Sequence, residues 1–186
     1  MVFFSLEKLK ENYDVTMRWH SYELRPAGSP PISPEYRARI EQSRPAFAQR
    51  MKQEHGVDIQ PGPFGINSRP ALIAEKFAEA QGAGEAFHDA AQRAYWVEGR
   101  DLSSHTVLRQ LLQQAGLEPN QLDIALSDPR YEAEVDEDIA QAREFGLEGV
   151  PALVFDDKYL ITGAQPYAML ARAVEQIMAD VNRSTP

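Results

Sequence analysis

Cysteine and histidine are the side chains that most often carry catalytic or metal chemistry, and neither forms a recognisable site in this sequence. The chain contains no cysteine, which excludes disulfides, thiolate metal sites and thiol catalysis by its own residues. The histidines lie far apart and form neither an i, i+4 pair nor an HExxH pattern. No metal site is therefore predicted, and one assembled only by folding is the alternative. The histidines are His20, His55, His88 and His105.

Carboxylates gather at two places. Asp136-Glu137-Asp138 falls in a predicted helix, and Asp156-Asp157 falls in a predicted turn. Solvated surfaces explain both clusters, and nothing marks a pair for acid–base catalysis, which is the functional alternative. The stretches FGIN and QGAG lack the strand–GxGxxG–helix context, so the sequence predicts neither a nucleotide site nor another bound cofactor.

Two short segments place residues with particular backbone preferences at the start of a predicted helix or strand. Asn67 or Ser68 precedes an apolar stripe at helical spacing and is predicted to cap that helix. In EGVPALVF, residues 148–155, Pro151 stands directly before a short apolar run. Proline cannot donate to a sheet ladder, so it is expected at a strand's first residue or at an edge. A trans proline with no function is the simpler interpretation of this second segment.

Length and composition limit the elements that could position these residues. The chain has 186 residues, 43% hydrophobic and 25% charged, with a net charge of -9. These values suit one domain, or one domain with a large insertion, and the acidic balance argues against nucleic-acid binding. No run approaches the roughly 20 apolar residues of a membrane span. The first residues are not those of a secretory signal, so a cytoplasmic location is expected.

The order of predicted elements defines the fold class. Residues 4–13 form a predicted helix and residues 15–24 a strand with alternating side chains. Helices follow to about residue 146; then ALVF (152–155) and YLIT (159–162) form a hairpin across the turn DDK, and residues 165–181 form a last helix. This order predicts an α/β, thioredoxin-like fold whose N-terminal strand is missing. Its domain would comprise 1–32 and 147–186, with 33–146 as an all-helical insertion domain.

Five segments carry a resemblance to a known family: WHSYELRP, FGINSRPALIAEKFAEA, YWVEGRDLSS, REFGLEGVPALVF and ITGAQPYAMLARAVEQI. Together they resemble the DsbA-type thioredoxin superfamily, with the cytoplasmic FrnE-like dithiol oxidoreductases as the nearest branch. The 2-hydroxychromene-2-carboxylate isomerases and the kappa-class glutathione transferases are more distant relatives. The resemblance runs from Phe3 to about Ile177, and GVPALVF followed by TGAQP is its most specific part.

The resemblance implies a substrate site. The Val150-Pro151 bond would be cis, and the loop of Gly149, Val150 and Pro151 would face the redox centre. There the backbone of Val150 would pair with an extended substrate peptide. The helix start at Asn67 and Ser68 would lie at the rim of the substrate cleft. The partners implied are protein or small thiol and disulfide substrates.

The family's C-x-x-C motif is absent. Aligning the start of the chain with that pattern places Val2 near the second cysteine position and Met1 just before it. Three explanations are open: an N-terminal truncation, a natural relative that lost catalysis but kept binding, or a first strand supplied by a second subunit. The uncapped start of the first helix and the bare sheet edge favour truncation. Dimerisation through that edge, giving a homodimer, is a hypothesis.

The sequence therefore predicts a FrnE-like dithiol/disulfide oxidoreductase by resemblance, redox-silent in this form because no thiol is present. A non-catalytic protein that binds peptides or thiol ligands is the alternative. A glutathione-dependent isomerase or transferase is a further alternative, disfavoured because the serine at the first motif position is also absent.

Overall fold

The computed structural model describes residues 2–184 of the chain. Contacts along the chain divide it into two compact units. We refer to Met1–Trp19 with Leu147–Pro186 as the hairpin unit, and to His20–Gly146 as the helical unit. The sequence suggested a first boundary after residue 32, whereas the contacts group residues 20–32 with the helices.

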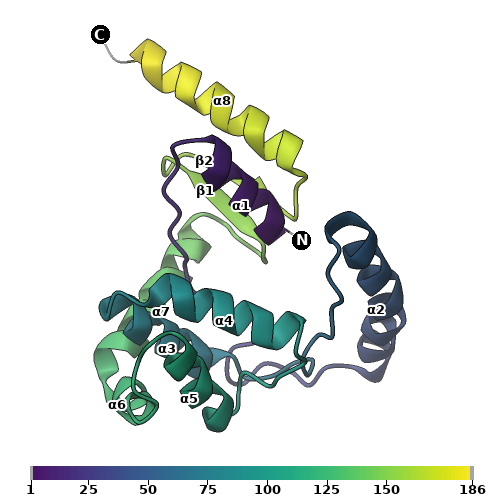
Figure 1. Ribbon diagram of the computed structural model, residues 1–186, viewed down its shortest axis with the longest axis vertical. Helices are drawn as coiled ribbons and strands as arrows, with labels where there is room; N and C mark the ends of the chain where they lie inside the picture. Colours follow the sequence, from purple (N-terminus) through teal and green to yellow (C-terminus); the bar gives the residue numbers. More distant parts are fainter. Residues whose placement is uncertain (1, 185–186) are drawn as a thin grey trace. The chain divides into compact units, whose positions relative to one another are not determined.

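Six helices make up the described secondary structure of the helical unit (Figure 1): α2 (Pro34–His55), α3 (Arg69–Ala80), α4 (Gly84–Trp96), α5 (His105–Gln114), α6 (Gln121–Ser127) and α7 (Pro129–Glu144). α3 is the central helix because it contacts α4, α5, α6 and α7. Phe77 of α3 is buried and meets the ring of Tyr131 edge-on at 5.6 Å. Phe87 and Leu108 are fully enclosed, and each such side chain contributes about 1.5–3 kcal/mol by leaving water.

α2 follows the start and stop signals of its sequence. The Ser33 hydroxyl accepts a hydrogen bond from the N–H of Tyr36, and Pro34 occupies the first turn. Gly56 ends the helix in the left-handed conformation, with φ of 70°, which glycine adopts without steric cost. Serine followed by proline is a common way for a helix to begin, so the residues at 33 and 34 account for this start.

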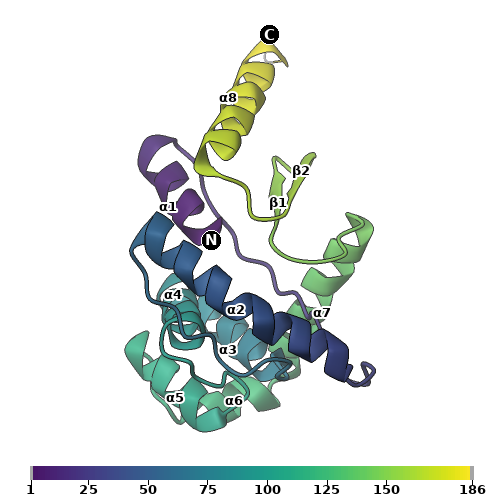
Figure 2. The same cartoon turned by 90° about the vertical axis from the view of Figure 1, so that its right-hand side faces the viewer.

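The hairpin unit contains α1 (Val2–Asn12), β1 (Ala152–Phe155), β2 (Tyr159–Thr162) and α8 (Tyr167–Ser184), which can be followed in Figure 2. The strands pair antiparallel, with Leu153 opposite Ile161. Asp156 and Asp157 form the turn with φ of 51° and 53°, a conformation that aspartate tolerates. The predicted hairpin is confirmed.

One face of this hairpin packs on the two helices. α1 contacts α8, and Leu6, Leu9 and Leu170 form the buried centre of the contact. The apolar side chains on the covered face of the strands pack against this centre; they are Leu153, Phe155 and Ile161. The two ends of the chain are thus joined through a shared core.

The predicted strand over residues 15–24 is wrong. The sheet within residues 2–184 contains β1 and β2 alone, and this segment is extended but irregular. The alternation that suggested a strand is nevertheless present, because Val15, Met17 and Trp19 pack on the helix core while residues 16, 18 and 20 are exposed. Alternation decides which side chains face the core, but a strand also needs a neighbour to complete its backbone hydrogen bonds.

Candidate functional site

The loop before β1 is open to solvent. Val150 keeps 51% of its surface exposed, and a Cβ added at Gly149 would meet nothing within 4 Å. The Val150-Pro151 peptide bond is cis. The exposed residue of this loop is therefore apolar, with free space beside Gly149.

One hydrogen bond connects this loop with the TGAQP segment, a second lies within that segment, and a third connects the segment with α1. The carbonyl of Pro151 accepts from the N–H of Gly163 at 2.8 Å. The Gln165 side chain donates to the carbonyl of Thr162 at 2.9 Å, and the Ser5 hydroxyl donates to the carbonyl of Gln165 at 3.3 Å. The two segments most specific to the family resemblance are thus adjacent in space, although twelve positions separate Pro151 from Gly163 in the sequence.

The residues that align with the family's second cysteine position and the position before it, Val2 and Met1, carry no thiol. Val2 is a partly buried residue that packs against the core of α1 and α8. Met1 lies outside the described residues. The hairpin unit therefore offers no thiol in the place where the family motif would put one.

The second predicted site segment lies in the helical unit, at the start of α3. The Asn67 side chain accepts a hydrogen bond from the N–H of Arg69 at 3.1 Å, so it satisfies the first N–H of the helix from the position before the N-cap. Ser68 makes no side-chain capping bond. Whether Asn67 and Ser68 share a site with Val150 stays a prediction, because the two segments belong to different units.

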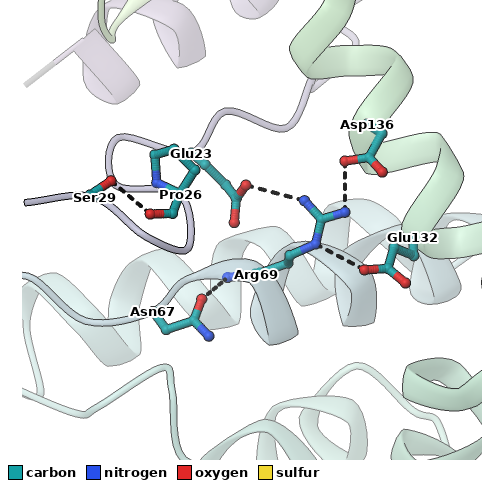
Figure 3. A network of polar contacts seen from close by, with 7 residues as sticks. All are labelled: Glu23, Pro26, Ser29, Asn67, Arg69, Glu132 and Asp136. Atoms are coloured by element: carbon teal, nitrogen blue, oxygen red, sulfur yellow. Dashed lines mark hydrogen bonds and ion pairs between the residues drawn. The ribbon is translucent and has the colours of Figure 1, made fainter.

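Arg69, the next residue, is the centre of an ionic network that the sequence did not reveal (Figure 3). Its guanidinium contacts Glu23 at 3.1 Å, Glu132 at 3.2 Å and Asp136 at 2.6 Å. The hydrogen bond with Asp136 raises the pKa of Arg69. These contacts attach residues 20–32 to α3 and α7, which is why that segment belongs to the helical unit.

A second network corrects the interpretation of Asp138 as a solvated carboxylate. Its side chain is 12% exposed and contacts the Lys76 ammonium at 2.8 Å. It also accepts from the N–H of Ser21 at 2.7 Å and lies 2.7 Å from His20 Nδ1. Burial alone would raise the pKa of Asp138, but the hydrogen bonds from Lys76, Ser21 and His20 lower it below its usual value.

The remaining polar groups show no assembled metal site. His88 Nδ1 lies 2.6 Å from Glu75 Oε1, and residues 2–184 contain no cluster of three or more potential metal ligands. Asp156 and Asp157 are exposed in the hairpin turn, as predicted. Within the described part of the chain, no helix has the length and hydropathy needed to span a membrane.

Comparison with known proteins gives a family match along most of the chain. The family model described as the DSBA-like thioredoxin domain matches residues 1–175. A probable thioredoxin from Archaeoglobus fulgidus is 43% identical over 42 residues, which cover 23% of this chain and 46% of that protein. The chain thus matches less than half the length of this relative.

Solved structures with a similar fold support the match. A probable DsbA oxidoreductase from Streptomyces coelicolor has 25% identity and a TM-score of 0.66, covering 80% of this chain and 63% of that one. The cytosolic disulfide reductase DsbM from Pseudomonas aeruginosa has 25% identity and a TM-score of 0.51, covering 70% and 75%. A 2-hydroxychromene-2-carboxylate isomerase has a TM-score of 0.79 with 100% and 92% coverage, but its 21% identity concerns the fold alone.

Proposed function

The chain belongs to the DSBA-like thioredoxin domain family, and on this premise we propose that it is a FrnE-like, redox-silent member. We propose further that it binds an extended peptide or a thiol-bearing ligand at the loop of Gly149, Val150 and Pro151. The thioredoxin-like fold with a helical insertion is confirmed by the family match and the similar structures. The branch, the redox silence and the ligand are proposals.

The absence of cysteine is the observation that carries the redox proposal. Disulfide exchange proceeds by attack of a thiolate on a disulfide sulfur, and this chain cannot supply one. In an insulin-reduction assay with dithiothreitol, we expect turbidity to develop at the rate of the no-protein control. A cysteine-containing thioredoxin serves as the positive control. Faster reduction in the presence of this chain would overturn the proposal.

The open loop supports the binding proposal. A peptide that pairs with the backbone of Val150 needs its N–H as a donor, so replacing this residue by proline removes the donor while replacing it by alanine does not. With labelled reduced insulin B chain as probe, we expect Val150→Pro to weaken binding about five-fold, the value of one ordinary hydrogen bond. Val150→Ala is the matched control and should bind within about two-fold of the parent, because its donor is intact.

Equal binding by the two variants would show that the backbone N–H of residue 150 does not contribute to peptide binding. The same conclusion follows if the parent chain does not bind the peptide. Circular dichroism of each variant establishes that the fold is retained before affinities are compared.

Truncation of an active oxidoreductase is the second candidate, favoured by the absent motif. It predicts that the codons in frame before Met1 encode a strand ending in C-x-x-C, and that the extended chain reduces insulin. A stop codon immediately upstream would refute it and support the binding protein. Glutathione-dependent isomerisation is disfavoured because the serine expected at the first motif position is absent, and the isomerase structure supports the fold alone.

We also propose a cytoplasmic location and a homodimer. The location is supported by the similarity to a cytosolic disulfide reductase from P. aeruginosa. The dimer is supported by the two-stranded sheet, since each strand has one edge unpaired by the other strand. Light scattering should give twice the chain mass of 20.9 kDa, and a clean monomer would reject the dimer.

A further inference from the structure

The helical unit contains a pocket that the proposed peptide loop does not use. Its volume is about 370 Å³, within the lower range of small-ligand sites. It is lined by Glu23, Pro26, Ala27, Arg69, Asp136, Ile139 and Arg143. All these residues belong to the helical unit, so the pocket stands independently of any function of the hairpin unit.

Two elements form the walls of the pocket. Asp136, Ile139 and Arg143 follow one another along one face of α7, because spacings of three, four and seven return to the same side of a helix. The other wall is the loop of Pro26 and Ala27. The carbonyl of Pro26 accepts from the Ser29 hydroxyl at 2.6 Å and from the Ser29 N–H at 3.0 Å, which fixes the shape of this turn (Figure 3).

Arg69 closes the pocket but is not available to a ligand. All three of its nitrogens that face the network are bonded to carboxylates, and the Glu23 side chain in this contact is 5% exposed. Figure 3 shows the guanidinium enclosed between the loop and α7. Arg69 therefore holds the two walls together.

Arg143 and Asp136 retain binding capacity. The Arg143 guanidinium lines the pocket, is exposed, and makes none of the hydrogen bonds or ion pairs formed among the described residues. It has five donors suited to a carboxylate. Asp136 uses Oδ1 for Arg69, and a carboxylate can accept about four hydrogen bonds. One end of the pocket thus suits an anion and the other a cation.

The spacing and charge of these two groups define the ligand. Seven positions separate Asp136 from Arg143, which places their Cα atoms about 10 Å apart along the helix. An extended peptide covers about 3.3–3.6 Å per residue, so a chain of about three residues matches this backbone spacing. Two arginines balance two carboxylates in the lining, and the chain as a whole carries a charge of -9. A simple anion is repelled by this overall charge, whereas a zwitterion with no net charge is not.

We propose that this pocket binds a short free peptide of about three residues by its two ends. The terminal carboxylate pairs with Arg143, the terminal ammonium pairs with Asp136, and the peptide body lies on Pro26, Ala27 and Ile139.

The test uses trialanine as the probe and the backbone amide NMR shifts of residues 136–143 as the readout. The parent chain should show saturable shifts. Arg143→Gln should weaken the apparent affinity at least about ten-fold, because charge-assisted hydrogen bonds are lost. Arg130→Gln is the matched control: it removes an exposed arginine of the same helix that is bonded to Asp128, outside the pocket. This control should bind like the parent.

Three further probes distinguish a free peptide from other possible ligands of the pocket. Trialanine amide should bind the parent as weakly as trialanine binds Arg143→Gln. N-acetyl-trialanine should also bind weakly; equal binding would mean that the site takes the tail of a longer chain and would overturn the free-peptide assignment. If acetate competes as well as trialanine, the pocket binds anions in general and the proposal of a peptide site is rejected. No saturable shift with trialanine, or equal losses in Arg143→Gln and Arg130→Gln, would reject the pocket as a peptide site.

Discussion

The helices around α3 in the helical unit and strand β2 in the hairpin unit bury their apolar residues to very different degrees. In the helical unit, Phe87, Leu108 and Val135 are 0% exposed around α3. In the hairpin unit, three of the four residues of β2 are exposed, and Leu160 keeps 42% of its surface in contact with solvent. A two-stranded hairpin has one face to pack on α1 and α8 and leaves the other uncovered within its unit. The difference teaches that the packing around α3 contributes most of the closed core, whereas β2 adds little to it.

The largest expected effect compares the loss of stability at a core position with that at an exposed strand position. Phe87→Ala should lower the free energy of unfolding by about 3–5 kcal/mol, because it leaves a cavity in a closed core. Leu160→Ala, on the exposed strand, should change it by no more than about 0.5 kcal/mol. Urea titrations of both variants measure the difference. Similar losses in the two variants would contradict the contrast between the closed core around α3 and the exposed strand β2.

The second effect concerns the ionic contact that holds residues 20–32 to the helices. Asp138→Asn should cost at most about 3 kcal/mol, since it leaves Lys76 with Glu79 as its remaining carboxylate. Glu137→Gln, an exposed neighbour, is the matched control and should be nearly neutral. Denaturant titration at neutral pH measures both.

The same substitution should also change the response to acid. The pKa of Asp138 in the folded chain lies below its ordinary value of 3.8, so its stabilisation is present above that pH. The stabilisation is lost as the pH falls through the folded-state pKa. The parent should therefore lose stability below about pH 4 more steeply than Asp138→Asn. Parallel acid profiles would show that this carboxylate is not linked to folding.

A smaller effect distinguishes the two adjacent residues at the start of α3. Asn67→Ala should cost about 1 kcal/mol, because its side chain caps the N–H of Arg69. Ser68→Ala should cost a few tenths, about 0.3 kcal/mol, because Ser68 makes no capping bond. Thermal unfolding of the two variants provides the measurement, and a larger loss at Ser68 would reverse the assignment of the cap.

The smallest effect lies in the hairpin unit, at the exposed contact between Tyr13 and α8. The hydroxyl of Tyr13 donates to Glu175 at 2.6 Å, and this bond raises the pKa of Tyr13 to about 12. Because the folded pKa exceeds the ordinary value of 10.0, the contact stabilises the fold below pH 10 and is lost as the pH rises toward 12. NMR titration of the Tyr13 ring should show the pKa falling toward 10.0 in Glu175→Gln. An unchanged titration would mean that Glu175 is not the cause.

Local patterns predicted the elements of the fold but not all their partners. The cap at Ser33, the hairpin across Asp156 and the buried stripe of α3 follow from neighbouring residues and were predictable. The irregular conformation of residues 15–24 was not predictable, because a strand forms only where a distant neighbour completes its ladder. Asp138 had the appearance of a surface residue because its partners, Lys76 and Ser21, lie far away in the sequence.

The pocket could be anticipated only in part. The spacing of Asp136, Ile139 and Arg143 on one helix gives a local signal for one wall. The opposite wall comes from the loop of Pro26 and Ala27, more than a hundred residues earlier, and no local pattern joins the two. The loop at Val150 was identified through resemblance, since its residues alone indicate only a proline before a strand.

The discontinuity of the hairpin unit has a consequence for biosynthesis. Tyr13 and Glu175 are 162 positions apart, and Ser5 and Gln165 are 160 positions apart. On a ribosome, α1 therefore emerges long before α8 and the hairpin exist to cover Leu6 and Leu9. The residues of the helical unit, His20–Gly146, are all synthesised in the interval and can fold first. We expect the apolar face of α1 to be exposed throughout that interval, so the nascent chain can aggregate through this helix before α8 is made.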